Sequence, residues 1–166
     1  MMRELELEAV RTVQAHLARS PLPQVARALS HWGEHGLGWY GLAAVGAAVD
    51  RDRRRAWMHV GVSAFAAHAA AVVVKRVVRR SRPDEDRVQV LVGTPSALSF
   101  PSAHATSTAA AAAALVPLVG WGPASGVLGV MGLSRVLLGV HFPFDVLAGC
   151  ALGATVERLA RVVVAR

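Results

Sequence analysis

The feature that most constrains this chain is a series of apolar stretches separated by short charged or turn-forming segments. The clearest stretch covers residues 56–74, and a helix of that length measures about 28 Å at 1.5 Å per residue. The hydrocarbon core of a bilayer is about 30 Å thick, so this helix is long enough to cross it. Further apolar stretches cover residues 36–49, 103–119, 124–140 and 143–156. The sequence therefore predicts an all-α, polytopic transmembrane helical bundle with about five spans.

The N-terminal segment is predicted to be an amphipathic helix at the membrane interface. Between Glu4 and Ser20, apolar residues recur on one face and charged residues occupy the others. The segment is too polar to span a bilayer, and Pro21 ends it. A second helix is predicted to start near Gln24 and to continue without a break to residue 49, because the apolar stretch at its end is too short to span alone.

The composition supports a membrane protein and argues against a nucleic-acid binder. Hydrophobic residues make up 54% of the chain and charged residues 17%, whereas a soluble domain is about 45–50% apolar and about 25% charged. The net charge of +7 would suit a nucleic acid. However, the arginines lie between apolar stretches and not in one stripe beside aromatic residues, so no nucleic-acid partner is expected. The single cysteine, Cys150, excludes an internal disulfide and a cysteine-based zinc site.

Three polar segments gather charged residues on one side of the predicted bundle. They are KRVVRRSRP at residues 75–83, PSAH at residues 101–104 and SRVLLGVHFPFD at residues 134–145. If the spans alternate in direction, all three lie at the same membrane face. Arg135 falls within a span, where an unpaired cation costs about 3 kcal/mol or more. This arginine therefore requires a polar cavity and an anionic partner.

These segments carry groups that bind phosphate. Lys75, Arg82 and Arg135 supply three cations, and the arginine fork matches a pair of phosphate oxygens. Ser102 is predicted to cap the helix that begins at Ala103. The free backbone N–H groups of such a helix N-terminus form a favourable anion site. The sequence therefore predicts a cradle for a group with two negative charges.

Two histidines and a carboxylate add the chemistry of phosphoryl transfer. His141 and Asp145 are four residues apart, so the carboxylate can fix the tautomer of the imidazole and leave its other nitrogen as a nucleophile. His104 is then available to protonate the departing oxygen. Residue types alone allow the histidines to exchange roles, and the Asp145 spacing favours His141 as the nucleophile. A metal site formed by these three residues lacks the dense spacing of known ligand motifs, so no metal is expected.

The order and spacing of these motifs resemble the type 2 phosphatidic acid phosphatase superfamily, which includes membrane lipid phosphatases and vanadium haloperoxidases. Its first motif, K-x-x-x-x-x-x-R-P, is matched at residues 75–83. Its second, P-S-G-H, is matched at residues 101–104, with Ala103 in place of glycine. Its third, S-R-x-x-x-x-x-H-x-x-x-D, is matched in full at residues 134–145. The apolar spans favour the membrane lipid phosphatases over the soluble haloperoxidases.

The resemblance implies a phosphohistidine on His141, an orienting role for Asp145 and a general acid at His104. It also implies that the phosphate is bound by Lys75, Arg82, Ser102, Arg135 and the backbone N–H of Ala103, and that no cofactor is required. Alanine retains that N–H, so a cost is expected only if the backbone there needs a positive φ. The implied organisation is one membrane-embedded phosphatase domain over residues 1–166, with an interfacial helix (1–22) and a catalytic helical bundle (23–166).

Within the superfamily, the stretches HWGEHG and GTPSALSFPSAHATS look most like the actinobacterial branch that dephosphorylates decaprenylphosphoryl-5-phosphoribose for cell-wall arabinan assembly. Glu34 and His35 are candidate contacts for the substrate headgroup, whereas His68 is interpreted as an interior histidine. The implied partners are a prenyl-linked phospholipid substrate and the lipid bilayer, and the implied location is the plasma membrane, crossed several times. A polyprenyl diphosphate phosphatase, or a phosphatidate or phosphatidylglycerophosphate phosphatase, is the alternative.

Two other classes stay open at this stage. One is a catalytically silent membrane scaffold, against which the intact nucleophile, acid and carboxylate argue. The other is a phosphotransferase, which product analysis separates from a hydrolase. The site can open on either side of the membrane. The distribution of Lys and Arg favours the cytoplasmic side, whereas the active sites of other lipid phosphatases of the superfamily commonly face outward.

Overall fold

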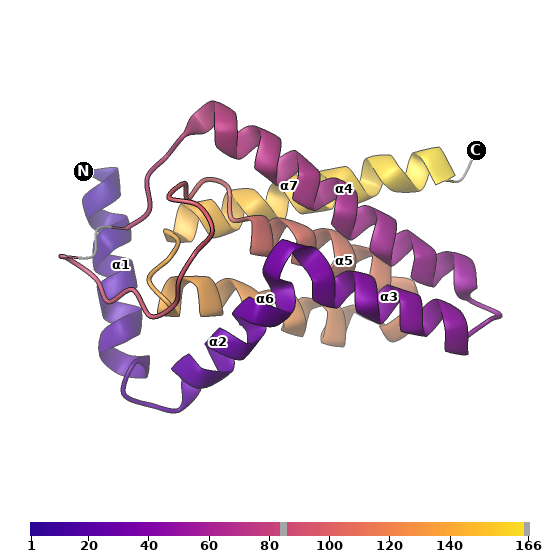
Figure 1. The fold of residues 1–166 in the computed structure, drawn as a ribbon, viewed down its shortest axis with the longest axis horizontal. Helices are drawn as coiled ribbons and strands as arrows, with labels where there is room; N and C mark the ends of the chain where they lie inside the picture. Colours follow the sequence, from indigo (N-terminus) through magenta and orange to yellow (C-terminus); the bar gives the residue numbers. More distant parts are fainter. Residues whose placement is uncertain (84–85, 165–166) are drawn as a thin grey trace.

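The computed structural model describes residues 1–83 and 86–164, and these form a bundle of helices (Figure 1). The helices are α1 (Met2–Leu17), α2 (Leu22–Gly33), the short 3-10 helix η1 (Glu34–Gly36), α3 (Leu37–Val49), α4 (Arg54–Val78), α5 (Ala103–Val119), α6 (Trp121–Leu137) and α7 (Pro143–Val164). The predicted all-α class is confirmed. The predicted helix at residues 103–119 has the bounds of α5, whereas α6 lies three residues earlier than predicted and α7 continues eight residues further.

Helix α5 is the centre of the bundle and packs against α4, α6 and α7. Its alanine side chains are buried on nearly every face, so neighbouring helices approach closely. On α7, a Cβ added at Gly149 would lie 2.8 Å from the Ser102 carbonyl oxygen, and one added at Gly153 would overlap the Thr106 carbonyl oxygen. These two glycines therefore set the distance between α5 and α7, as small residues do where helices pack tightly in membranes.

Helix α1 crosses one end of the bundle, beside the segment that connects α4 to α5 (Figure 1). Its apolar face is buried, since Leu7 and Val10 pack into a cluster with Phe142 and Val146. The buried Gln14 donates from Nε2 to the Leu137 carbonyl oxygen at 3.0 Å. The helix is therefore attached to the bundle. Its role as an amphipathic helix at a membrane interface stays a prediction.

The predicted continuous helix from Gln24 to residue 49 is wrong. Helix α2 ends at Gly33, and α3 begins only at Leu37. Between them His35 has φ 51° and ψ 13°, and Gly36 has φ 78°. Both values lie in the left-handed region, which an α-helix cannot contain, so the chain changes direction here. The break brings the end of α2 and η1 against α5.

Of the helices in the described parts of the chain, α4 alone is both long and apolar enough to cross a membrane, with a mean hydropathy of 1.6 over its best window. Helix α5 is a shorter apolar helix. The polar connections fall at two ends: the α3–α4 turn and the C-terminal part of α7 lie at one end, and the α4–α5 and α6–α7 connections at the other (Figure 1). This matches the predicted grouping of the polar segments on one side.

Candidate active site

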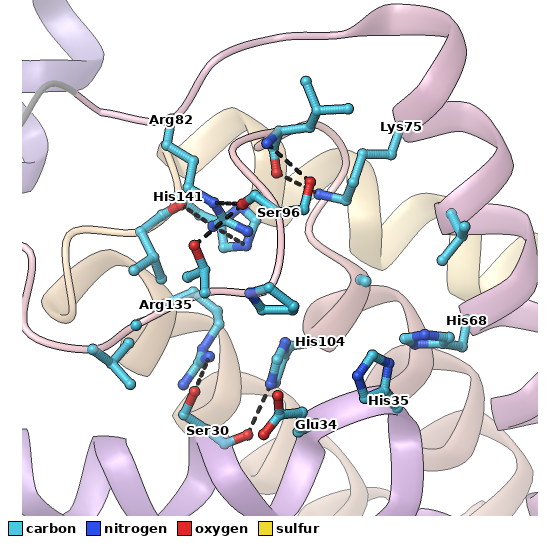
Figure 2. A pocket seen from close by; sticks show the side chains of 18 of the residues that line it. Ser30, Glu34, His35, His68, Lys75, Arg82, Ser96, His104, Arg135 and His141 are labelled. Atoms are coloured by element: carbon cyan, nitrogen blue, oxygen red, sulfur yellow. Dashed lines mark hydrogen bonds between the residues drawn. The ribbon is translucent and has the colours of Figure 1, made fainter.

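A cavity of about 440 Å³ opens at the end of the bundle that carries the three polar segments. Figure 2 shows its side chains. The predicted site residues that line it are Lys75, Arg82, Ala103, His104, Arg135 and His141. Ser102 and Asp145 are fully buried directly behind this lining. The structure thus brings together residues that are up to 70 positions apart in the sequence.

His141 lies in the connection between α6 and α7 and is 3% exposed. Its Nε2 is 3.2 Å from Arg82 Nη1. A guanidinium only donates hydrogen bonds, so Nε2 is the acceptor and the imidazole proton is on Nδ1. Nδ1 faces Asp145 Oδ2 at 3.7 Å, which is longer than a hydrogen bond but close enough for electrostatic attraction. Burial lowers the pKa of His141 to about 3, so the ring is neutral at pH 7 and Nε2 is unprotonated, with its lone pair directed at Arg82.

Asp145 is held by two further donors. Its Oδ2 accepts the Phe142 N–H at 2.9 Å, and its Oδ1 accepts Arg80 Nη1 at 2.7 Å. The other arm of Arg80 donates to Glu6 Oε2 on α1 at 2.5 Å, and the guanidinium lies 4.2 Å from the centre of the Phe142 ring. Sequence reasoning missed Arg80 and Glu6, because nothing distinguishes one arginine from its neighbours within a basic run.

Lys75 and Arg82 are oriented by carbonyl groups of the α4–α5 connection. Lys75 Nζ donates to the Leu98 carbonyl oxygen at 2.8 Å. Arg82 donates from Nε to the Ser96 carbonyl oxygen at 2.8 Å and from Nη1 to the Val140 carbonyl oxygen at 2.5 Å. Burial lowers the pKa of Arg82 to about 10, so it stays charged at neutral pH. Both cations line the cavity with donors left over for an anion.

Arg135 and His104 are both anchored by Ser30 on α2 (Figure 2). Arg135 is 1% exposed and donates from Nη1 to Ser30 Oγ at 2.9 Å, from Nε to Ser134 Oγ at 3.1 Å and from Nη2 to the Ala26 carbonyl oxygen at 3.3 Å. His104 Nε2 lies 3.0 Å from the Ser30 carbonyl oxygen. A carbonyl only accepts, so Nε2 carries a proton and Nδ1 is the nitrogen that can exchange one. Sequence reasoning missed Ser30, whose local sequence carries no motif.

Ser102 caps α5 as predicted. Its Oγ accepts the Ala105 N–H at 3.4 Å, and it is fully buried behind the cavity wall. A direct contact between its hydroxyl and a phosphate stays a prediction. Ala103 begins the helix and is not among the residues with positive φ. Its methyl group therefore causes no backbone strain where the motif usually has glycine.

Glu34, His35 and His68 also line the cavity. In Figure 2 they lie on the opposite side of His104 from Arg82 and His141. The interpretation of His68 as a satisfied interior histidine is wrong, because its Nδ1 is buried without a hydrogen-bond partner and the residue faces the cavity.

An all-helical bundle with three cations and two histidines around one cavity has the parts that a phosphoryl-transfer enzyme needs. The sequence pattern of the PAP2 superfamily matches residues 56–166, and the chain belongs to this superfamily. It is therefore related to a family of lipid phosphatases.

Named relatives and solved structures agree with this assignment. The chain is 56% identical over 138 residues to a decaprenylphosphoryl-5-phosphoribose phosphatase of Mycolicibacterium smegmatis. The aligned residues cover 82% of this chain and 77% of the relative. It is 51% identical over 152 residues to the Mycobacterium tuberculosis protein of the same name, covering 91% and 86%. A transmembrane PAP2 type phosphatidylglycerolphosphate phosphatase from Bacillus subtilis shares the fold, with a TM-score of 0.77 and 24% identity over 98% of this chain and 85% of that one. Aquifex aeolicus LpxE does so with a TM-score of 0.75 and 19% identity over 95% of each chain.

Proposed function

We propose that this protein is an integral membrane phosphatase that removes the 5-phosphate from decaprenylphosphoryl-5-phosphoribose, a step in cell-wall arabinan biosynthesis. The observation that carries the reaction type is the arrangement of His141, whose unprotonated Nε2 faces the cavity beside Arg82. The identity with relatives named for this substrate supports the choice of lipid. A neutral imidazole next to fixed cations is suited to attack a phosphoryl group.

In the first step, the lone pair of His141 Nε2 attacks phosphorus in line with the bond to the sugar oxygen. That P–O bond breaks, and the departing oxygen takes a proton from Nδ1 of His104, which the negative charge of the bound phosphate holds in the protonated form. The dephosphorylated lipid leaves with a free hydroxyl group. The proton on His141 Nδ1 stays directed at Asp145, which stabilises the positive charge of the phosphohistidine.

In the second step, a water molecule attacks the phosphohistidine and gives one proton to His104 Nδ1. The P–N bond breaks, inorganic phosphate leaves, and both histidines return to their starting states. Lys75, Arg82 and Arg135 offset the charge on the three phosphoryl oxygens throughout, together with the N–H groups at the start of α5. Electrostatic stabilisation of this kind supplies most of the rate enhancement in phosphoryl transfer.

The proposed setting is a plasma membrane crossed by α3 to α7, with α1 at the interface near the active site and residues 1–166 forming one domain. Support comes from the outward face of α4, which exposes large apolar side chains along its length: Met58, Val62, Phe65, Val73 and Val77. A soluble monomer rarely leaves such a surface in contact with water, and lipid chains would cover it.

The test is phosphate release by purified protein from three prenyl substrates of equal chain length, a prenyl phosphoribose 5-phosphate, a prenyl monophosphate and a prenyl diphosphate, and from a phosphatidate. We expect the first to be hydrolysed with the highest kcat/KM and His141→Ala to abolish turnover. Highest activity on the diphosphate would favour the alternative carrier-lipid phosphatase. Appreciable turnover by His141→Ala would refute the nucleophile assignment, and absence of release from every substrate would refute the phosphatase.

A further inference from the structure

The cavity is much larger than the phosphate that its cations would hold. Its volume of about 440 Å³ lies within the range of about 300–1,000 Å³ typical of sites for whole small molecules. Lys75, Arg82 and His141 lie on one side of His104, and Glu34, His35 and His68 lie on the other (Figure 2). A phosphate bound at the cations leaves the second part for the group that is attached to it.

The position of His35 is fixed by an unusual backbone. The residue has φ 51°, which residues other than glycine adopt only where surrounding structure holds them, and such residues cluster at functional sites. Its ring packs edge to face against that of His68, with ring centres 5.8 Å apart. The break between α2 and α3 therefore places an imidazole in the cavity wall at a position that a continuous helix would not reach.

His68 offers a polar atom without a partner. It lies seven residues before Lys75 on α4, so both side chains share one face of that helix and line the same cavity. Its Nδ1 is buried and accepts or donates no hydrogen bond within the protein. Buried polar atoms are nearly always bonded, and an unbonded one in a cavity wall is an available contact for a ligand.

The side chains of Glu34, His35 and His68 differ in chemistry from the cations Lys75 and Arg82 in the other part of the cavity. His35 and His68 are uncharged donors or acceptors when neutral, and Glu34 supplies a carboxylate. A carboxylate repels a second phosphate but accepts hydrogen bonds from hydroxyl groups. A wall of this kind therefore fits a neutral group with several hydroxyls next to the scissile phosphate, and it disfavours a diphosphate.

We propose that His35, His68 and Glu34 form a sugar subsite that binds the hydroxyl groups of the pentose whose phosphate is removed. This inference rests on the proposed function and makes it more specific, since it identifies the residues that separate a prenyl phosphosugar from a plain prenyl phosphate.

The experiment compares kcat/KM for a prenyl phosphoribose 5-phosphate and a prenyl monophosphate of equal chain length, with the full-length purified protein. The variants are His68→Phe, which keeps a planar aromatic ring but removes both ring nitrogens, His35→Asn, which tolerates the left-handed backbone, and Glu34→Gln. The matched control is His16→Asn on α1, where the ring is exposed and bonds only to the Thr12 carbonyl oxygen of its own helix.

We expect each subsite variant to lose about tenfold on the sugar substrate, the size of one lost hydrogen bond, and to retain activity on the prenyl monophosphate. The control should change neither value. An equal loss on both substrates, or no loss on the sugar substrate, overturns the subsite while the phosphatase stands. Failure of the wild-type protein to release phosphate from both substrates overturns the proposed function itself.

Discussion

Replacing Ser30 with alanine tests whether α2 positions the catalytic cavity. The Ser30 hydroxyl accepts the shortest of the three hydrogen bonds of Arg135, at 2.9 Å. Arg135 is 1% exposed, so water cannot replace the lost partner. A hydrogen bond to a charged group contributes about 1.5–3 kcal/mol, and each 1.36 kcal/mol corresponds to tenfold in rate. We therefore expect kcat/KM for phosphate release to fall about 10- to 100-fold.

The same variant separates the two tasks of Ser30. Alanine keeps the backbone carbonyl that accepts from His104, so the pH profile of kcat/KM should keep its shape while its height drops. Ser30→Thr retains a hydroxyl and should recover part of the activity. Ser125→Ala is the control, because Ser125 is exposed and bonds only to carbonyl groups of its own helix. A loss below about threefold, less than one ordinary hydrogen bond, would refute the reasoning.

Three further changes probe other contacts. Arg80→Gln removes the 2.7 Å charged bond to Asp145 and should lower kcat about tenfold; an unchanged kcat would contradict this role. Because the pKa of His141 is lowered by burial to about 3, against about 6.5 when unfolded, only the unfolded chain binds this proton between those values. The free energy of unfolding should therefore decrease as the pH falls below about 6.5, by up to about 1.4 kcal/mol per pH unit. Between pH 7.5 and pH 5.5, the Tm of His141→Asn should fall less than that of the wild type, and equal falls would contradict this prediction. Glu157, 2% exposed, accepts from Arg161 and pairs with His59. Glu157→Gln should lower the free energy of unfolding by about 2–3 kcal/mol, with allowance for the exposure of Arg161, and an unchanged Tm would argue against it.

The sequence predicted the helical class, the bounds of α5 and the gathering of three motifs at one end of the bundle. These predictions rest on properties that are local or strictly spaced. Apolar runs indicate helices of a given length. The four-residue interval between His141 and Asp145 brings the imidazole, which lies just before α7, within 3.7 Å of the carboxylate in the first turn of that helix. The helical φ of Ala103 also follows from its position after a capping serine.

The break after Gly33 could not be predicted in the same way. Glu34 and His35 are compatible with a helix, and the close contact at the break is made with a distant residue: a Cβ at Gly33 would lie 2.8 Å from Cδ2 of His104, which is 71 residues away. The role of Ser30 was hidden for the same reason. Its partner Arg135 lies on another helix, and no local pattern links the two.

The contacts of the first two helices have a consequence for how relatives can diverge. The sequence pattern shared across the superfamily begins at residue 56, yet His104 and Arg135 are supported by Ser30, and Asp145 is supported through Arg80 by Glu6. A chimaera that exchanged residues 1–55 between two relatives would keep every catalytic side chain but replace several of the residues that orient these side chains. Substrate preference could then change in evolution through substitutions in residues 1–55, which lie outside the shared superfamily pattern, while the reaction itself stayed the same.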